Sequence, residues 1–180
     1  MKHNGASDFT DTASDIRRLP ASSTLYSIEN SLLDAFEMGL LSIARHFFAT
    51  SDTPALQAWR HAYGFAVDEW GETLGLAAAY KLQKVISAIM SARQDKFDYL
   101  DPFMPESHHS LTSDEVNLML MLHYMRREET RLARDAAEKV CLGYCDPHVV
   151  RTGLSLAFRF SLGAEKSKRP GQQAGLFVVP

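Results

Sequence analysis

The stretch LTSDEVNLMLMLHYM, residues 111–125, decides the fold class of this chain. Thr112 and Glu115 have the spacing of a capping box, in which each residue's side chain accepts a hydrogen bond from the other's backbone N–H. Leu111 and Val116 occupy the two positions of a hydrophobic staple. We therefore expect a helix to begin at residue 112 or 113.

Apolar residues surround the helical wheel from Val116 to Met125, which predicts a central helix buried on nearly every side. We interpret His123, within this segment, as a histidine bonded to a neighbouring polar group rather than as a catalytic residue. Polar residues return at 126–130, and an amphipathic pattern then resumes as far as Cys141. The pattern leaves open whether 113–142 forms one helix or two.

Two helical segments are predicted before this central helix. Apolar residues recur every three or four positions from Leu25 to Phe47, which predicts one helix of about 25 residues. Residues 54–93 continue the helical pattern, but their apolar positions shift around the wheel near Gly71 and Gly75. Because a glycine costs about 1 kcal/mol in a helix interior, two helices are favoured there over one, although one kinked helix stays open.

The remaining segments are a connection and a last helix. Residues 94–111 contain two prolines and no periodicity, so we expect a long exposed connection. Asp146 and Pro147 form an N-cap followed by a proline, which predicts a helix start. This helix has two adjoining apolar stripes, one of Val150, Leu154, Ala157 and Phe158 and one of Val149, Leu156 and Phe160. Gly163 is its expected stop.

Together these segments predict an all-α, single-domain bundle of five to seven helices over residues 24–163. The 180-residue length corresponds to about 1.2 average domains, and 46% hydrophobic with 23% charged residues is typical of globular chains. Residues 1–23 and 164–180 have polar or basic compositions, so we expect a flexible arm and a flexible tail. Residues 1–22 and 165–180 are expected to be dispensable for folding. No strand pattern is recognised.

Composition also bounds location and partners. The start of the chain has no apolar leader, and no run of about 20 apolar residues occurs. With only two cysteines, the chain is expected to be cytoplasmic, with neither a disulfide framework nor a membrane span. A net charge of −3 gives the protein no positive electrostatic field that would attract nucleic acid. Acidic residues also interrupt the arginines within residues 126–134. A DNA-binding regulator is therefore a second alternative only.

One segment has residues that zinc prefers as ligands. The short segment that contains Cys141, Cys145 and His148 connects two predicted helices. His108 or His109 could supply the fourth ligand of a closed site. The competing interpretation is a buried core cysteine beside an incidental one. A metal-binding protein or enzyme that uses the 98–109 connection and this cluster is therefore the first alternative, with zinc as its only implied cofactor.

The leading hypothesis is a non-enzymatic regulatory or adaptor-like helical module, without a cofactor, that binds itself or another protein. Aromatic residues are enriched at interface centres, and paired small residues let helices approach closely. The candidate interface residues are Trp59, Tyr63, Trp70, Gly71 and Gly75. We expect a homodimer that uses an apolar helix within residues 25–92, and sedimentation equilibrium would test it.

The helix start at residue 112 gives the first testable prediction. Replacing Thr112 by Ala removes the N-cap acceptor of the central helix, so the free energy of unfolding should fall by about 0.5–2 kcal/mol. Urea unfolding of the two proteins measures this difference. An unchanged midpoint would contradict the proposed boundary.

Overall fold

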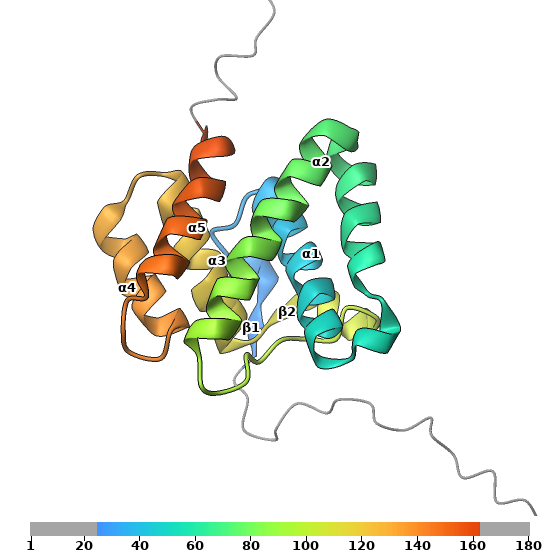
Figure 1. Ribbon diagram of the computed structural model, residues 1–180, viewed down its shortest axis with the longest axis horizontal. Helices are drawn as coiled ribbons and strands as arrows, with labels where there is room; N and C mark the ends of the chain where they lie inside the picture. The colour runs from blue at the N-terminus through green and yellow to red at the C-terminus, as the bar shows by residue number, and fades with distance from the viewer. Residues whose placement is uncertain (1–24, 163–180) are drawn as a thin grey trace, which may run out of the picture.

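The computed structural model describes residues 25–162, and this part of the chain is built almost wholly from helices (Figure 1). The helices and strands are α1 (Ala35–Asp52), α2 (Trp59–Ala92), α3 (Ser113–Arg126), α4 (Thr130–Val140), α5 (Pro147–Arg159), the 3₁₀ helices η1 (Ile28–Asn30), η2 (Pro54–Leu56) and η3 (Pro105–His109), and the strands β1 (Tyr26–Ser27) and β2 (Ser110–Leu111). The all-α prediction is confirmed. The predictions for 1–23 and 164–180 lie outside the described residues.

The central helix begins where the sequence predicts. In the capping box of α3, Glu115 N–H donates to Thr112 Oγ1 at 3.1 Å and Thr112 N–H donates to Glu115 Oε2 at 2.9 Å. The Thr112 hydroxyl also donates to the Asp98 carbonyl at 2.7 Å, which ties the helix start to the preceding connection. α3 ends at Arg126 and α4 begins at Thr130, so the segment 113–142 is two helices.

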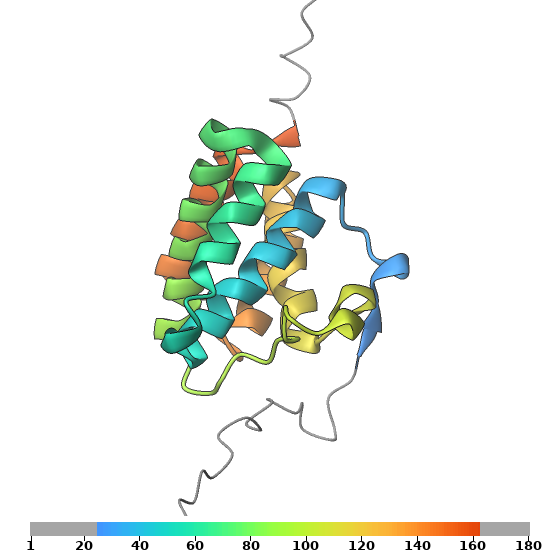
Figure 2. The same ribbon diagram turned by 90° about the vertical axis from the view of Figure 1, so that its right-hand side faces the viewer.

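The first helix is shorter than the apolar stripe predicts. α1 begins at Ala35 because Asp34 caps it, with the Asp34 carboxylate accepting from the Glu37 N–H at 2.9 Å. Residues before this cap form β1 and η1 instead, and β1 pairs antiparallel with β2. Figure 2 shows these segments and η3 together at one edge of the helices. The prediction of one helix from Leu25 onward was therefore wrong.

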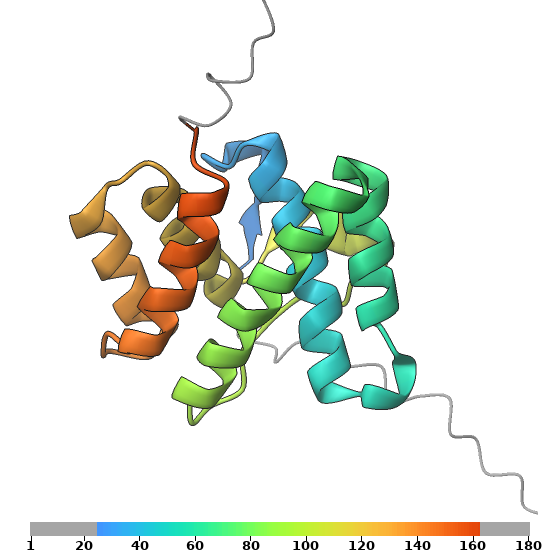
Figure 3. The ribbon, with the colours of Figure 1, turned by 45° about the horizontal axis from the view of Figure 1, so that its top comes forward.

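α2 is two helical halves that fold back on each other (Figures 1 and 3). Gly71 has φ +75° and ψ 164°, a conformation that favours glycine and that reverses the chain direction here. Gly75 then lies against the first half, because a Cβ at this position would be 2.1 Å from the Ala66 carbonyl oxygen. The two-helix interpretation of 54–93 is confirmed.

The connection between α2 and α3 is partly buried, which corrects the expectation of an exposed segment. Phe97 is 2% exposed, and its ring stacks on Phe48 of α1 at 4.1 Å between centroids. The buried Arg45 donates to Glu115 at 2.7 Å, to the Ser107 carbonyl at 2.6 Å and to the Ser110 carbonyl at 2.7 Å. The Arg45 guanidinium on α1 thus supplies hydrogen-bond donors to backbone carbonyls of this irregular connection.

α5 connects the α1–α2 pair of helices to the α3–α4 pair. α1 packs on α2, α3 packs on α4, and α5 packs on both α2 and α3. Lys81 of α2 donates to the Ser155 hydroxyl of α5 at 2.8 Å at this junction. Within residues 25–162 we find no helix with the length and apolar character to cross a membrane.

The fold back of α2 gives the second prediction. Gly75→Ala should lower the free energy of unfolding by about 1–3 kcal/mol, because the new methyl group meets backbone that must shift. Gly64→Ala is the matched control, since nothing lies within 4 Å of a Cβ there and alanine favours the helix by about 0.5–1 kcal/mol. Chemical unfolding compares the two. Equal effects would contradict the close approach at Gly75.

Candidate protein-binding surface

α5 leaves part of one of its two apolar stripes uncovered. Val149 and Leu156 of one stripe are fully buried, and Ala157 of the other stripe is 1% exposed. Phe158 of the other stripe is 88% exposed, and Leu154, one turn earlier, is 49% exposed. Contiguous exposed apolar patches, rather than single exposed side chains, are typical of contact surfaces for other molecules.

A local N-cap and close packing against α3 fix the orientation of α5. Asp146 Oδ1 accepts from the N–H groups of His148 at 2.8 Å and Val149 at 3.0 Å, so α5 begins at Pro147 as predicted. Gly153 faces α3, where a Cβ would be only 2.7 Å from Met125 Sδ. Because α5 presses its glycine face against α3, Leu154 and Phe158 project away from that contact.

A groove runs beside the exposed stripe. α4 and α5 each pack on α3 but make little contact with each other, which leaves a cavity of about 300 Å³ between α4 and α5. Another cavity, of about 350 Å³, lies elsewhere, between α3 and the segment before α1. The apolar lining of the cavity between α4 and α5 is Tyr124, Met125, Ala133, Cys145, Val150 and Leu154. We call this groove together with Phe158 the α5 surface.

Two acidic residues flank one end of the groove. Glu128 has φ +61° in the turn between α3 and α4, and Glu129 N–H donates to the Tyr124 carbonyl at 2.9 Å. Both side chains are exposed and belong to the groove wall. In the described part of the chain, neither carboxylate has a cation within 4.0 Å. Arg134 also lines the groove, but no ion pair joins it to either glutamate, so this end of the groove has two exposed carboxylates without a bound cation in the described residues.

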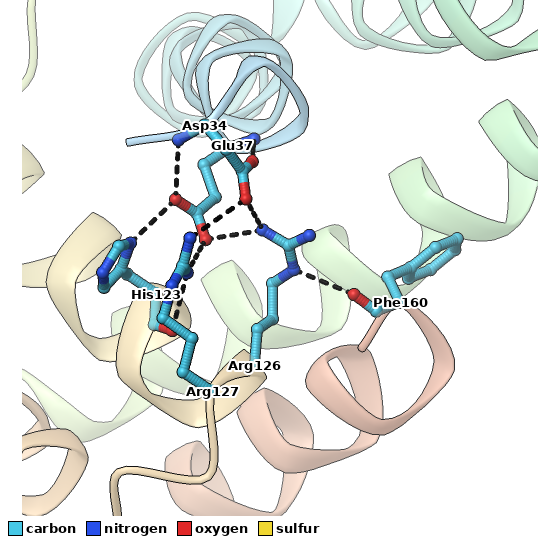
Figure 4. A network of polar contacts seen from close by, with 6 residues as sticks. All are labelled: Asp34, Glu37, His123, Arg126, Arg127 and Phe160. Atoms are coloured by element: carbon cyan, nitrogen blue, oxygen red, sulfur yellow. Dashed lines mark hydrogen bonds and ion pairs between the residues drawn. The ribbon is translucent and has the colours of Figure 1, made fainter. Parts of the chain in front are cut away.

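A buried ionic network anchors this end of the groove to α1 (Figure 4). Glu37, which is fully buried, accepts from Arg126 Nη1 at 2.5 Å, Arg127 Nη1 at 2.6 Å and His123 Nδ1 at 2.9 Å. Asp34 Oδ2 accepts from the same two arginines, at 2.7 Å and 3.2 Å. His123 is thus bonded to a polar neighbour, as the sequence analysis interpreted it.

Arg126 links three elements through one guanidinium. Besides its bonds to α1, its Nε donates to the Phe160 carbonyl, just beyond α5, at 2.9 Å (Figure 4). The guanidinium also lies over the Phe36 ring, 4.7 Å from the centroid. The end of α5 and the turn that carries Glu128 and Glu129 are therefore held to the start of α1, which fixes the walls of the groove.

The carboxylates of the network stay ionised. Burial alone would raise the pKa of Glu37, but hydrogen bonds from His123, Arg127 and the Asp34 backbone outweigh it and lower that pKa below its usual range. Burial likewise opposes ionisation of Asp34, whose pKa is lowered by its bond from the Glu37 N–H and by both arginines. The two carboxylates balance the two guanidiniums, so the network has a structural rather than a catalytic charge pattern.

The predicted metal ligands do not meet. Cys141 is fully buried, where burial raises the pKa of its thiol, and Cys145 lies in the groove lining. His148 is exposed at the start of α5, whereas His108 and His109 are exposed in η3 at the opposite side of the molecule (Figures 1 and 2). Within residues 25–162, no three His, Cys, Asp or Glu side chains form a group that could hold a metal ion. The zinc hypothesis stays a prediction.

The predicted interface residues lie on α2, and several contact their own chain. Trp70 packs on Phe36 with ring centroids 4.6 Å apart, and it lies against Gly39. Tyr63 donates to Gln83 at 3.0 Å, and Gly71 and Gly75 serve the fold back of α2. Trp59 is 42% exposed and keeps a free edge. An interface at these residues stays a prediction, but most of their apolar area has a partner within the chain.

A histidine pair between α1 and α2 was not predicted from the sequence. His46 and His61 stack with ring centroids 5.7 Å apart, and His46 Nδ1 is a buried atom without a hydrogen-bond partner in the described residues. Burial, with His61 second, lowers the pKa of His46 to about 4. His46 is therefore a neutral packing residue near pH 7. Only knowledge of the α1–α2 contact could have paired it with His61.

Comparisons with known proteins return no match. The chain fits no protein-family model, and neither the curated proteins nor the solved structures contain a significant relative. These comparisons assign neither a family nor a function to the chain.

The network around Glu37 gives the third prediction. Glu37→Gln should lower the free energy of unfolding by about 3–5 kcal/mol, because it removes the fully buried carboxylate that both guanidiniums share and leaves the buried Arg126 with Asp34 as its one remaining carboxylate. Glu72→Gln, at an exposed position of α2, is the control and should change it by less than about 0.5 kcal/mol. Urea unfolding measures both. A small loss for Glu37→Gln would show that the network is not a stabilising anchor.

The His46 environment gives a prediction of pH dependence. The folded-state pKa of about 4 lies below the ordinary 6.5, so the unfolded chain binds the proton first and folding stability falls as the pH drops from 6.5 towards 4. The lowered pKa values of Asp34 and Glu37 act at lower pH, below their ordinary 3.8 and 4.5.

His46→Gln should therefore lose less stability than the natural chain between about pH 7 and pH 5. Unfolding curves at several pH values measure this loss. His148→Gln, at an exposed histidine, is the control and should behave like the natural chain. The same pH dependence in all three proteins would contradict the burial of His46 as a neutral group.

Proposed function

We propose that this protein is a non-enzymatic, adaptor-like helical module that binds a protein partner through the α5 surface. The single observation that carries the proposal is Phe158, which is 88% exposed in the last turn of α5, a helix that packs on both α2 and α3. Exposing an aromatic ring to water is unfavourable by about 1.5–3 kcal/mol relative to burying it. A partner that covers the ring recovers this free energy.

The residues around Phe158 support a binding surface for a protein partner, because Phe158 is not an isolated exposed side chain. Leu154 continues the apolar stripe into the groove, and Glu128 and Glu129 border it, which gives an apolar centre with a charged rim. Such a centre and rim are the general anatomy of protein interfaces. The anchoring of both groove walls through Arg126 also supports this function, because a preformed site loses less conformational entropy on binding.

Site-specific cross-linking in cells tests this function. A photoreactive phenylalanine analogue placed at position 158 should form adducts with a protein partner. The same analogue at Phe103 is the matched control, since Phe103 is 47% exposed but lies in the α2–α3 connection. Leu154→Glu combined with the analogue at 158 should abolish the adducts. No adduct at 158, or equal adducts at both positions, would contradict the proposed function.

A further inference from the structure

We infer that the partner of the α5 surface is a second copy of this chain, with the two α5 helices antiparallel across a two-fold axis. This inference rests on the proposed function and names its partner. In the arrangement, Phe158 of each copy enters the groove of the other. The occupant follows from three properties of the surface, namely the position of its groove, its charge and its size.

The protruding ring and the groove lie on the same helix. Phe158 follows Leu154 by one turn, and Leu154 lines the groove together with Val150. A two-fold axis across this part of α5 therefore brings each ring to the other groove at once, and the contact closes with two copies. The groove of about 300 Å³ has room for the ring, because an engineered cavity of about 150 Å³ accommodates benzene.

The charges match an antiparallel pair. α5 carries Arg151 and Arg159 on its exposed face and has no acidic residue between Pro147 and Arg159. The turn between α3 and α4, which carries Glu128 and Glu129, lies toward the C-terminal end of α5 (Figure 3). Arg126 binds the Phe160 carbonyl at this end (Figure 4). Antiparallel pairing therefore places Arg151 of the second copy at this acidic end. The pairing adds a second cation beside Arg134, which lines the groove without forming an ion pair with either glutamate in the described residues.

The size of the surface predicts a weak dimer. α5 has 13 residues, so it is about 20 Å long. Paired helices of this length with their flanking grooves bury on the order of 1,000 Å² in total, which is the lower end for a specific interface. We therefore expect association in the micromolar range, and measurements must cover a range of concentrations.

Sedimentation equilibrium of the purified full chain tests the second copy. Over about 1 to 100 µM, the mass should rise from 20.1 kDa towards twice that value. Phe158→Ser should weaken association at least tenfold, or about 1.4 kcal/mol. Leu32→Ser is the control, since Leu32 is 67% exposed beside η1, and it should leave association unchanged. A monomer at every concentration would overturn the inference, as would a dimer that Phe158→Ser does not weaken.

Charge reversal tests the antiparallel geometry. Arg151→Glu should weaken the dimer, as should Glu128→Arg with Glu129→Arg, whereas the three changes together should restore it. These side chains are exposed, so thermal unfolding should show that every variant folds. Equal weakening in the combined variant would overturn the antiparallel pairing.

Cys145 provides an independent report on the groove itself. Its thiol is partly exposed in the groove lining, whereas Cys141 is fully buried. Alkylation of Cys145 should slow as the protein concentration rises, and Phe158→Ser should remove this protection. A rate independent of concentration in the natural chain would overturn occupation of the groove by a second copy.

Different experimental results would contradict the proposed function and the second copy as its partner. A chain that stays monomeric but forms adducts at position 158 with a different protein would overturn the second copy and leave the proposed function intact. A chain that forms no adduct at 158 would overturn the proposed function itself.

Discussion

The fully buried carboxylate of Glu37 is the constraint on which the arrangement of this protein depends. An ionised carboxylate without a partner is several kcal/mol unfavourable in a protein interior, so its donors must come from elements that fold against α1. Those donors are Arg126, Arg127 and His123, all at the end of α3. The start of α1 and the end of α3 are therefore held together, and Arg126 extends the link to α5 through Phe160.

This link connects the interior of the molecule to its candidate function. The groove of the α5 surface exists because α4 and α5 both rest on α3 without closing on each other. Arg126 and Arg127 precede the turn of Glu128 and Glu129 directly, so the network that satisfies Glu37 also sets where the acidic end of the groove lies. A second buried pair, Arg45 with Glu115, plays the same part for the α2–α3 connection at the other end of α3. Interior electrostatics thus shape an otherwise apolar surface.

Local signals in the sequence were sufficient for some elements and not for others. The capping box at Thr112, the cap at Asp146 and the break near Gly71 depend on neighbouring residues, and each was predicted. The start of α1 has a local signal, the capping box of Asp34 and Glu37, that the apolar stripe from Leu25 concealed. The buried α2–α3 connection and the contact of α1 with α3 depend on partners far along the chain: Arg45 and Glu115 are 70 residues apart, and Asp34 and Arg126 are 92 apart. For the candidate site, both apolar stripes of α5 were predicted, but which one faces solvent depends on where α3 lies. Periodicity holds no information on that position.

Native-state hydrogen exchange of Glu37→Gln tests most directly whether the network holds the groove in place. The amides to follow are those of Glu128 and Glu129, which donate within the groove wall, and that of Phe160, which donates to Leu156 at the end of α5. We predict that these amides exchange much faster in the variant, while the amides of Leu82 to Ile89 in the core of α2 lose protection only by the change in global stability. Unchanged exchange at the groove wall, or a uniform loss of protection across all helices, would contradict the account.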